Sequence, residues 1–233
     1  MESAFHTYPS RELLAEALAA GVAAVLSGGI ATRGAATLAL SGGSTPKRFL
    51  EVLSGADIDW SDVTVTLVDE RWVPADSDRS NAALVRQHLL RGPAAAAHFM
   101  PLYREDKTPE EAQPDLCALL RTFSEPFDAL VLGMGLDGHT ASFLPQADNL
   151  AWATAADCPD PIVPIRTPVV PEPRVTLSLP IVTSARLLAL HIEGEDKKQV
   201  LETAKGDGPT LDLPIRSVLR AEREDPLEVF WAP

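Results

Sequence analysis

The stretch that decides the fold is Phe127–Pro145, which reads FDALVLGMGLDGHTASFLP. Its apolar run, Ala129–Leu132, has the length and unbroken hydrophobicity of a strand buried on both faces of a parallel sheet. Asp137 and His139 follow in a glycine-rich turn at the carboxyl end of this strand, where open α/β sheets bind their ligands. An ordinary turn with a capping histidine is the alternative, but imidazole moves protons most readily near neutral pH. We therefore interpret the turn as a functional site.

The same turn contains a formal GxGxxG pattern, formed by Gly133, Gly135 and Gly138. A dinucleotide-binding fingerprint also needs an acidic residue about 20 positions later, at the end of a second strand. Asp157 has roughly that spacing, but its surroundings, ATAADCPDP, are not typical of a strand. We therefore do not expect a dinucleotide site.

A second glycine turn, SGGSTPK at residues 41–47, follows a short apolar strand predicted at Thr37–Leu40. Pro46 suits the first position of a helix, with Thr45 as its N-cap. A strand, a glycine turn and a helix start together present free backbone N–H groups to an anion. A tight connection whose hydroxyls only cap the helix would have the same sequence, and the Walker pattern is absent. The phosphate-binding candidates in this turn are Gly42, Gly43, Ser44 and Thr45.

Charged side chains follow two further predicted strands. Val63–Val68 leads to Arg71, whose planar guanidinium suits a phosphate or a carboxylate, although a surface ion pair with Glu70 is the alternative. Leu187–Ile192 leads to a helix that starts near Gly194 and carries Lys197 in its first turn. A cation is unfavourable there unless an anion also binds, so Lys197 is either a phosphate ligand or a solvated lysine.

The rest of the chain alternates helices with short strands. Helices are predicted at Ser10–Ser27 (ended by Gly28-Gly29), Asp78–Arg91, Pro180–Ala185 and Pro214–Ala221, and another begins in a capping box at Thr108, with a break or kink at Pro114. Further strands are predicted at Ile162–Arg166, Val175–Leu179 and Val229–Trp231. This alternation predicts an α/β fold, with a mainly parallel sheet flanked by helices, as a single domain over residues 1–233.

Composition restricts the class of partner. The 233 residues carry a net charge of −13, from 33 acidic and 20 basic side chains, which argues against non-specific binding to nucleic acid or to an anionic membrane surface. Cys117 and Cys158 lack metal-ligand or CxxC spacing, so we expect free thiols in a reducing compartment. We see no secretory signal and no apolar run that approaches transmembrane length. We expect a cytoplasmic protein with a small-molecule partner.

Four stretches together resemble the 6-phosphogluconolactonases, whose family also contains glucosamine-6-phosphate isomerase/deaminases. They are LALSGGSTP (Leu38–Pro46), VDERWVPADSDRSN (Val68–Asn81), LGMGLDGHTASFLP (Leu132–Pro145) and PRVTLSLPIVTSAR (Pro173–Arg186), with GEDKKQVL (Gly194–Leu201) as a weaker fifth. The resemblance implies a modified Rossmann-like fold of the sugar-phosphate isomerase/deaminase type. It also implies hydrolysis of 6-phospho-D-glucono-1,5-lactone to 6-phospho-D-gluconate, with no metal or organic cofactor.

The resemblance also implies roles for individual side chains. His139 is the expected base that deprotonates water, and Asp137, Asp69 or both would orient the imidazole or the substrate hydroxyls. Arg71 would serve either the developing oxyanion or the phosphate. The residues expected to bind the substrate or its phosphate are Gly42, Gly43, Ser44, Thr45, Arg71, Gly138, Arg174 and Lys197.

Two other functions fit parts of the sequence. The deaminases of this family carry a glutamate after the DGH element that assists ring opening, but Leu144 stands at the corresponding place here and cannot move a proton. A non-catalytic sugar-phosphate-binding protein is the second alternative, and the intact pair of Asp137 and His139 argues against it.

Overall fold

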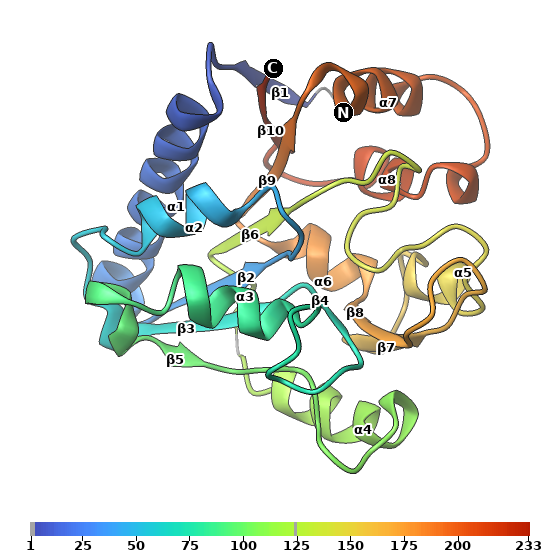
Figure 1. Ribbon diagram of the computed structural model, residues 1–233, viewed down its shortest axis with the longest axis horizontal. Coiled ribbons are helices and arrows are strands. Elements are labelled where there is room, and N and C mark those ends of the chain that lie inside the picture. Colours follow the sequence, from blue (N-terminus) through green and yellow to red (C-terminus); the bar gives the residue numbers. More distant parts are fainter. Residues whose placement is uncertain (1–2, 124) are drawn as a thin grey trace.

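The computed structural model describes residues 3–123 and 125–233. Its centre is a seven-stranded sheet in the order β1-β10-β9-β6-β2-β3-β5, in which every neighbouring pair is parallel (Figure 1). Its strands are β1 (Ala4–Thr7), β2 (Ala36–Leu40), β3 (Val63–Leu67), β5 (His98–Phe99), β6 (Ala129–Leu132), β9 (Leu187–Glu193) and β10 (Glu228–Ala232). Strand β6 pairs with β2 and β9, and all four of its residues are buried. The predicted α/β fold with a mainly parallel sheet is confirmed.

A smaller antiparallel sheet, not distinguished in the sequence, stands beside the first. Its order is β4 (Asp69–Arg71), β8 (Arg174–Leu177) and β7 (Ile162–Ile165). Val68 joins the two sheets, because its N–H donates to Leu40 O at 2.9 Å and its carbonyl accepts from the N–H of Leu177 at 2.8 Å. The chain therefore leaves the parallel sheet after β3 and pairs at once with a strand that comes about a hundred residues later.

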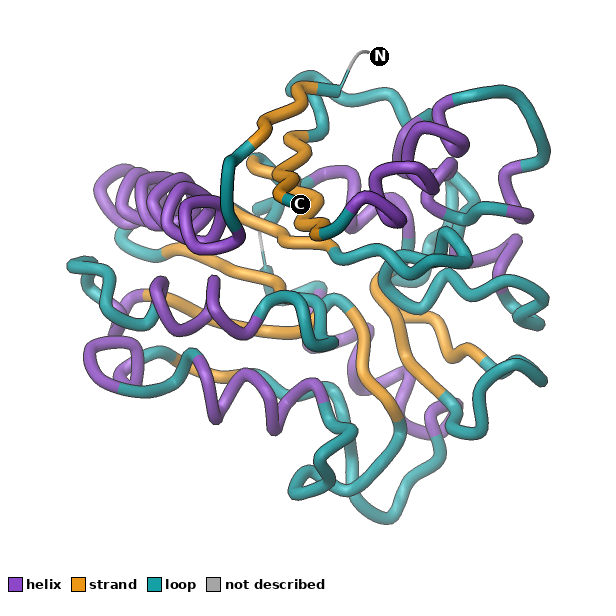
Figure 2. The backbone as a smooth tube through the Cα atoms, turned by 45° about the horizontal axis from the view of Figure 1, so that its top comes forward, coloured by secondary structure: helices purple, strands orange, loops and turns teal. Residues whose placement is uncertain are grey.

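Helices cover the sheets. They are α1 (Arg11–Arg33), α2 (Lys47–Leu53), α3 (Asn81–His88), α4 (Pro109–Leu120), α5 (Leu150–Ala153), α6 (Leu179–Ser184), α7 (Glu195–Lys205) and α8 (Ile215–Leu219), with 3₁₀ turns η1 (Trp60–Asp62), η2 (Gly92–Ala96) and η3 (Thr210–Asp212). Helix α1 crosses β2, β6, β9 and β10, and α2 packs beside it (Figure 2). Helix α4 packs against β7, and α7 packs against β9.

Helix α1 is longer than predicted, because Gly28-Gly29 does not end it. The helix continues to Arg33, and Gly34 ends it at φ 77°, with its N–H bonded to Ile30 O at 2.8 Å. A Cβ added at Gly29 would lie 3.1 Å from the Ala36 Cβ. Gly29 therefore lets the helix approach the start of β2 closely, which explains a glycine inside the helix.

Helix α1 is also long and apolar enough, by length and composition, to cross a membrane, so the expectation that no apolar run reaches that length is wrong. In the structure, the stripe formed by Leu14, Leu18, Val22 and Leu26 is fully buried in the core. These residues recur at helical spacing and face the sheet. The helix therefore packs as a core helix of the α/β fold.

Helix starts agree with the predictions in part. The capping box of Thr108 and Glu111 forms as predicted. Helix α3, predicted at Asp78–Arg91, starts after its N-cap Ser80 and ends at His88. The predicted cap at Thr45 is wrong, because Pro46 occupies the N-cap position of α2 without a side-chain hydrogen bond. The Thr45 hydroxyl is bonded to another partner, described below.

The break expected at Pro114 does not occur, because α4 is one helix from Pro109 to Leu120. A proline removes a single hydrogen bond of the helical ladder. Two features stabilise the helix in spite of that loss. They are the capping box at its start and the burial of Leu116 and Leu120, which lie one turn apart after Pro114.

Candidate active site

A cavity of about 250 Å³ lies at the carboxyl ends of the parallel strands. The turns after β2, β3 and β6 form its wall, together with the end of β9 and the start of α7. Since parallel strands end at one edge of the sheet, segments far apart in the sequence meet here. Nine of the eleven predicted site residues line this cavity: Gly42, Gly43, Ser44, Thr45, Asp69, Arg71, His139, Arg174 and Lys197.

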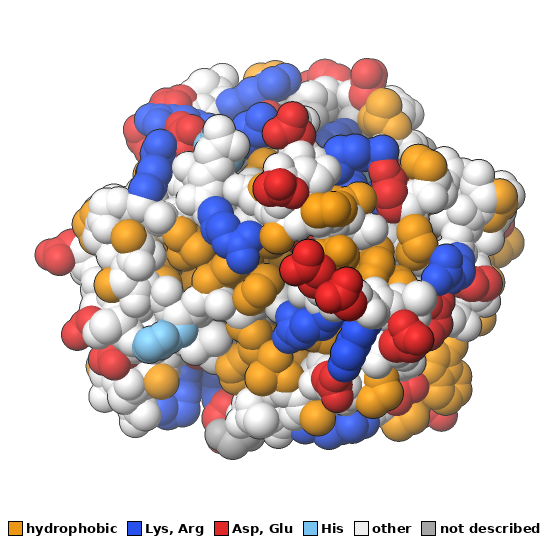
Figure 3. Space-filling model, turned by 60° about the horizontal axis from the view of Figure 1, so that its bottom comes forward, with side chains coloured by type: hydrophobic (Ala, Val, Ile, Leu, Met, Phe, Trp, Pro, Cys, Tyr) orange, Lys and Arg blue, Asp and Glu red, His pale blue; other side chains and the backbone are white. Residues whose placement is uncertain are grey.

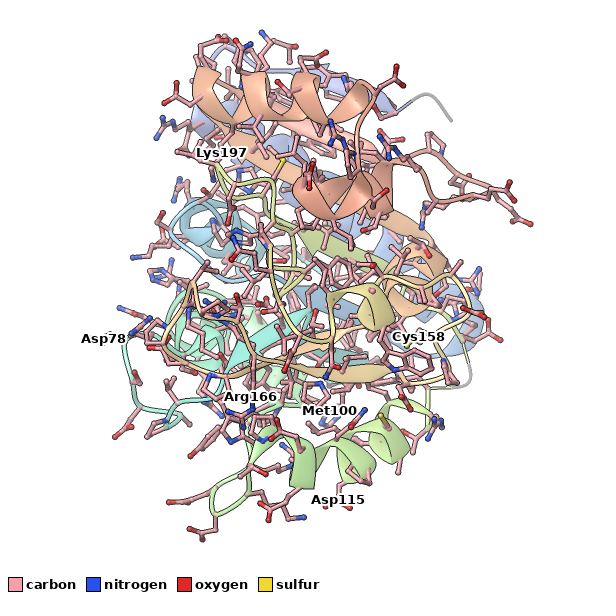
Figure 4. All side chains as sticks on the ribbon, turned by 90° about the vertical axis from the view of Figure 1, so that its right-hand side faces the viewer. Asp78, Met100, Asp115, Cys158, Arg166 and Lys197 are labelled. Carbon is pink, nitrogen blue, oxygen red and sulfur yellow. The ribbon has the colours of Figure 1, made fainter. Side chains whose placement is uncertain are left out.

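The first wall is the glycine turn after β2. Gly43 adopts φ 96°, a conformation that glycine takes without strain, so the turn folds tightly around the end of the strand. The Nζ of Lys197 donates to the Thr45 hydroxyl at 3.2 Å, which ties the start of α7 to this turn. Burial lowers the pKa of Lys197, and Glu193 opposes that shift. Figure 4 shows Lys197 below α7, close to the loop that follows β6.

The second wall is the turn after β6. Asp137 Oδ1 lies 2.6 Å from His139 Nδ1, and it also accepts from the His139 backbone N–H at 3.2 Å. This contact lowers the pKa of Asp137 more strongly than burial raises it. An ionised carboxylate only accepts hydrogen bonds, so Nδ1 carries the proton and Nε2 of the neutral imidazole is left as an acceptor.

Gly135 makes this geometry possible. A Cβ added there would lie 2.3 Å from His139 Nδ1 and 2.5 Å from Asp137 Oδ1, which no real side chain allows. The Gly135 N–H also donates to His139 O at 2.9 Å, so the turn closes on itself. The glycine therefore leaves room for the histidine–aspartate pair.

The third wall is buried and ionic. Asp69 Oδ2 accepts from the Ser142 hydroxyl at 2.5 Å and lies 3.6 Å from Arg174 Nη1. Arg71 and Arg174 are opposite each other across the antiparallel pair of β4 and β8. Burial lowers the pKa of Arg174, and the nearby charge of Arg71 adds to that shift while Asp69 opposes it. Among the residues that the structure describes, the buried Nε of Arg174 has no hydrogen-bond partner.

Two predicted residues lie outside the cavity wall. Asp137 contacts the cavity only through His139, and its side chain is 50% exposed. Gly138 adopts φ 74° and its carbonyl accepts from the Ile215 N–H at 2.8 Å. A Cβ added at Gly138 would meet Leu213 at 2.7 Å, so this glycine seats the turn against the segment before α8.

The cavity also contains residues that the sequence did not single out. Asn81 and His191 line it, and both are 2% exposed. Asn81 could have been noticed as the last residue of VDERWVPADSDRSN, whereas His191 lies inside an apolar strand that offers no such indication. Glu70 is fully buried rather than paired with Arg71 at the surface, and burial raises its pKa although three backbone N–H groups oppose the shift.

Over residues 3–123 and 125–233, no group of three or more His, Cys, Asp or Glu side chains is arranged to hold a metal ion. On the face shown in Figure 3, Lys and Arg side chains alternate with Asp and Glu side chains around a hydrophobic centre. Within the cavity itself, three cationic side chains line the wall: Arg71, Arg174 and Lys197.

Comparison with known proteins places the chain in a family. It belongs to the glucosamine-6-phosphate isomerases/6-phosphogluconolactonase family, whose model matches residues 9–231. Within that family it is 49% identical to the 6-phosphogluconolactonase of Mesorhizobium japonicum, over 98% of this chain and 95% of that one. It is 45% identical to the 6-phosphogluconolactonase of Rhizobium meliloti over the whole of both chains. The crystal structure of a 6-phosphogluconolactonase from Shewanella baltica superposes with a TM-score of 0.95, at 40% identity and over 100% of this chain and 98% of that one.

Proposed function

We propose that this protein hydrolyses 6-phospho-D-glucono-1,5-lactone to 6-phospho-D-gluconate. The observation that carries the proposal is the composition of one cavity, where His139, bonded to Asp137 behind it, lines the same space as three cations, Arg71, Arg174 and Lys197. The pair can take a proton from water, and the cations can hold a phosphate and offset the charge that develops on the lactone carbonyl. Relatives that match over their full length are 6-phosphogluconolactonases.

The reaction starts with a water molecule beside His139. Its oxygen attacks the lactone carbonyl carbon while Nε2 takes one of its protons, which gives a tetrahedral oxyanion and an imidazolium. Asp137 holds Nδ1 at 2.6 Å and stabilises the positive ring. When the ring C–O bond breaks, the imidazolium returns the proton to the leaving oxygen, and the product is the open-chain acid.

The phosphate is held at the other end of the substrate. The turn of Gly42, Gly43, Ser44 and Thr45 presents backbone N–H groups and hydroxyls, and Lys197 adds a positive charge beside the Thr45 hydroxyl. Arg174 supplies a guanidinium whose Nε has no protein partner among the described residues, so an anionic oxygen is a suitable acceptor for it. Arg71 adds a further guanidinium, which serves either a phosphate oxygen or the oxyanion that develops on the lactone carbonyl.

The test is hydrolysis of freshly made 6-phosphogluconolactone, measured as acid release with the spontaneous rate subtracted. We expect strong acceleration with the phosphorylated lactone and a much lower kcat/KM with unphosphorylated gluconolactone. Equal kcat/KM values for the two lactones would refute the phosphate assignment. Release of ammonia from glucosamine 6-phosphate would refute the lactonase assignment, which is why the buried Leu144 matters: it offers no group for ring opening.

The cellular setting of the proposal is the cytoplasm. Cys117 and Cys158 are buried free thiols in this structure, as suits a reducing compartment. The proposed partner is the small sugar phosphate alone, with neither nucleic acid nor membrane.

A further inference from the structure

Asn81, the first residue of α3, makes two different hydrogen bonds at the wall of the cavity. Its Nδ2 donates to the backbone carbonyl of Asp69 at 2.9 Å, and its Oδ1 accepts from Nη1 of Arg71 at 2.6 Å. The side chain is 2% exposed and lines the same cavity as His139. Asn81 therefore contacts two residues of the proposed site and faces its ligand space.

The backbone of Asn81 is fixed from behind by Glu70. The Glu70 carboxylate is fully buried and accepts from the N–H groups of Arg71, Asn81 and Ala82, each at 2.8 Å. It also accepts from the hydroxyl of Ser80 at 3.1 Å. This carboxylate joins β4 to the start of α3, so the amide of Asn81 projects from a rigid support.

The glycine turn leaves room for this amide. A Cβ added at Gly42 would lie 1.8 Å from Asn81 Oδ1 and 2.8 Å from its Nδ2. Asn81 is thus in contact with the turn after β2 and with both ends of the short strand β4. It is the side chain at which these two walls of the cavity meet.

The hydrogen bonds of the Arg71 side chain leave one edge of its guanidinium for a ligand. Both bonds found within the described residues use Nη1, one to Asn81 Oδ1 and one to the carbonyl of Arg79 at 2.9 Å. Nη2 and Nε, on the remaining edge, are free to meet an anionic oxygen. The orientation of that edge therefore depends on these two bonds, and the shorter one, to Asn81, comes from a side chain.

We propose that Asn81 is a positioning residue, which aims the guanidinium of Arg71 into the cavity and requires an amide to do so. The proposal rests on the function proposed above. The amide donates to the Asp69 carbonyl and accepts from Arg71 at the same time, whereas an ionised carboxylate of the same shape has no donor. An aspartate at position 81 would place a carboxylate oxygen against that carbonyl, and its charge would offset the charge that Arg71 presents to the substrate.

The experiment is a double-mutant cycle in the lactonase assay, using Asn81→Ala, Arg71→Ala and the double variant. We expect Asn81→Ala to lower kcat/KM about 10- to 100-fold, since a misplaced site group can cost about 10² in rate. In the Arg71→Ala background, the same substitution should cost less than about 3-fold, because the group that it positions is gone. Additive losses would overturn the proposal, and so would an unchanged kcat/KM in Asn81→Ala.

Asn81→Asp separates positioning from folding, because it keeps the shape of the side chain. We expect it to lose at least as much kcat/KM as Asn81→Ala in protein that circular dichroism shows to be folded, with a lower Tm because two acceptor oxygens then meet in a buried place. The matched control is Asn149→Ala, which also removes an amide that donates to a backbone carbonyl, that of Pro164 at 3.0 Å, but away from the cavity. It should leave kcat/KM unchanged. Full activity in Asn81→Asp would overturn the requirement for an amide.

Calorimetric titration with 6-phosphogluconate distinguishes failure of this proposal from failure of the proposed function. If the wild type does not accelerate lactone hydrolysis, the function fails, but the anion should still bind the wild type at least about 5-fold more tightly than Asn81→Asp. If the wild type is active and the two proteins bind the anion equally, with equal kcat/KM, the role of Asn81 fails alone.

Discussion

The two sides of the cavity differ in how far they are exposed to water. The side chains of His139 and Asp137 are 35% and 50% exposed, whereas those of Arg174 and Asp69 are 9% and 6% exposed. Water is a reactant, so the side proposed to move protons must stay open to it. The side proposed to hold the anion gains from burial, because a charge acts more strongly where water is excluded.

The two sides also differ in how the chain builds them. The pair of Asp137 and His139 comes from one turn of five residues that closes at Gly135. The buried side needs Asp69 from β4, Ser142 from the segment after β6 and Arg174 from β8. Substitutions in the turn should therefore act on the chemical step, and substitutions on the buried side on substrate binding.

The largest effect is expected on the exposed side, from His139→Ala or His139→Gln. Loss of a positioned base typically costs about 10² to 10⁴ in rate, so kcat should fall by that factor while KM changes little. The measurement is initial-rate kinetics with the spontaneous opening of the lactone subtracted. A folded His139→Ala protein with near wild-type kcat would move the role of base to Asp69 or Asp137.

The pH profile tests the same residue. The wild-type kcat/KM should fall as the pH is lowered, because a protonated imidazole cannot accept a proton from water. The bond from His139 keeps the pKa of Asp137 below its ordinary value of 3.8, so a loss above that pH does not report on Asp137. In His139→Gln this acid limb should disappear, and its persistence would contradict the assignment.

The second effect compares two glycines of one turn. Gly135→Ala should lower kcat about 100-fold, because the added Cβ would displace both His139 and Asp137. Gly133→Ala is the control, since a Cβ there would meet nothing within 4 Å among the described residues. It should keep kcat within about 3-fold of the wild type. Equal losses in the two variants would mean that the turn resists any added side chain, irrespective of the histidine–aspartate pair.

The third effect belongs to the buried side. Arg174→Gln should raise KM about 10- to 100-fold, the range that a charge-assisted hydrogen bond worth about 1.5–3 kcal/mol supports, with a smaller change in kcat. Steady-state kinetics and the affinity for 6-phosphogluconate give the two values. A purely kcat effect would assign Arg174 to the reacting carbonyl rather than to the phosphate.

The smallest effect is expected from Arg79→Ala. Arg79 pairs with Glu172 between the loops that precede α3 and β8, and its side chain is 52% exposed. Exposed ion pairs are worth about 0.2–1 kcal/mol, so Tm should change slightly and kcat/KM by less than about 3-fold. A loss as large as that of Arg174→Gln would mean that exposed charges, and not the buried set, decide anion binding.

The local features of this chain could be predicted from its sequence. Strand β6 and the glycine turn after it are encoded in consecutive residues, and the capping box needs only Thr108 and Glu111. The end of α1 was predicted too early, because Gly29 serves the contact with Ala36, which lies outside the helix. The cap at Thr45 was wrong because its hydroxyl bonds to Lys197, about 150 residues later.

The buried part of the site could not be predicted in the same way. Glu70 resembled a surface acid in the sequence, yet it joins β4 to α3 through partners up to 12 residues away. Arg71 and Arg174 meet only because β4 and β8 pair, and β4 is three residues long. Such a strand has too few residues for a pattern, so the side chains it brings together appear only in the folded protein.

The order of the strands also bears on how the chain matures during synthesis. Strand β1 (Ala4–Thr7) pairs with β10 (Glu228–Ala232) at the edge of the sheet. The first strand to be synthesised therefore cannot pair until the last strand is made. A ribosome that adds about 5–20 residues per second would leave β1 without its partner for roughly 10–50 seconds. During that interval β2, β3 and β6 are synthesised and can pair with one another. The edge of β9 that pairs with β10 stays unpaired until β10 is made. A nascent chain halted before residue 228 would thus leave unpaired the two strand edges that β10 joins, those of β1 and β9, and unpaired strand edges favour aggregation.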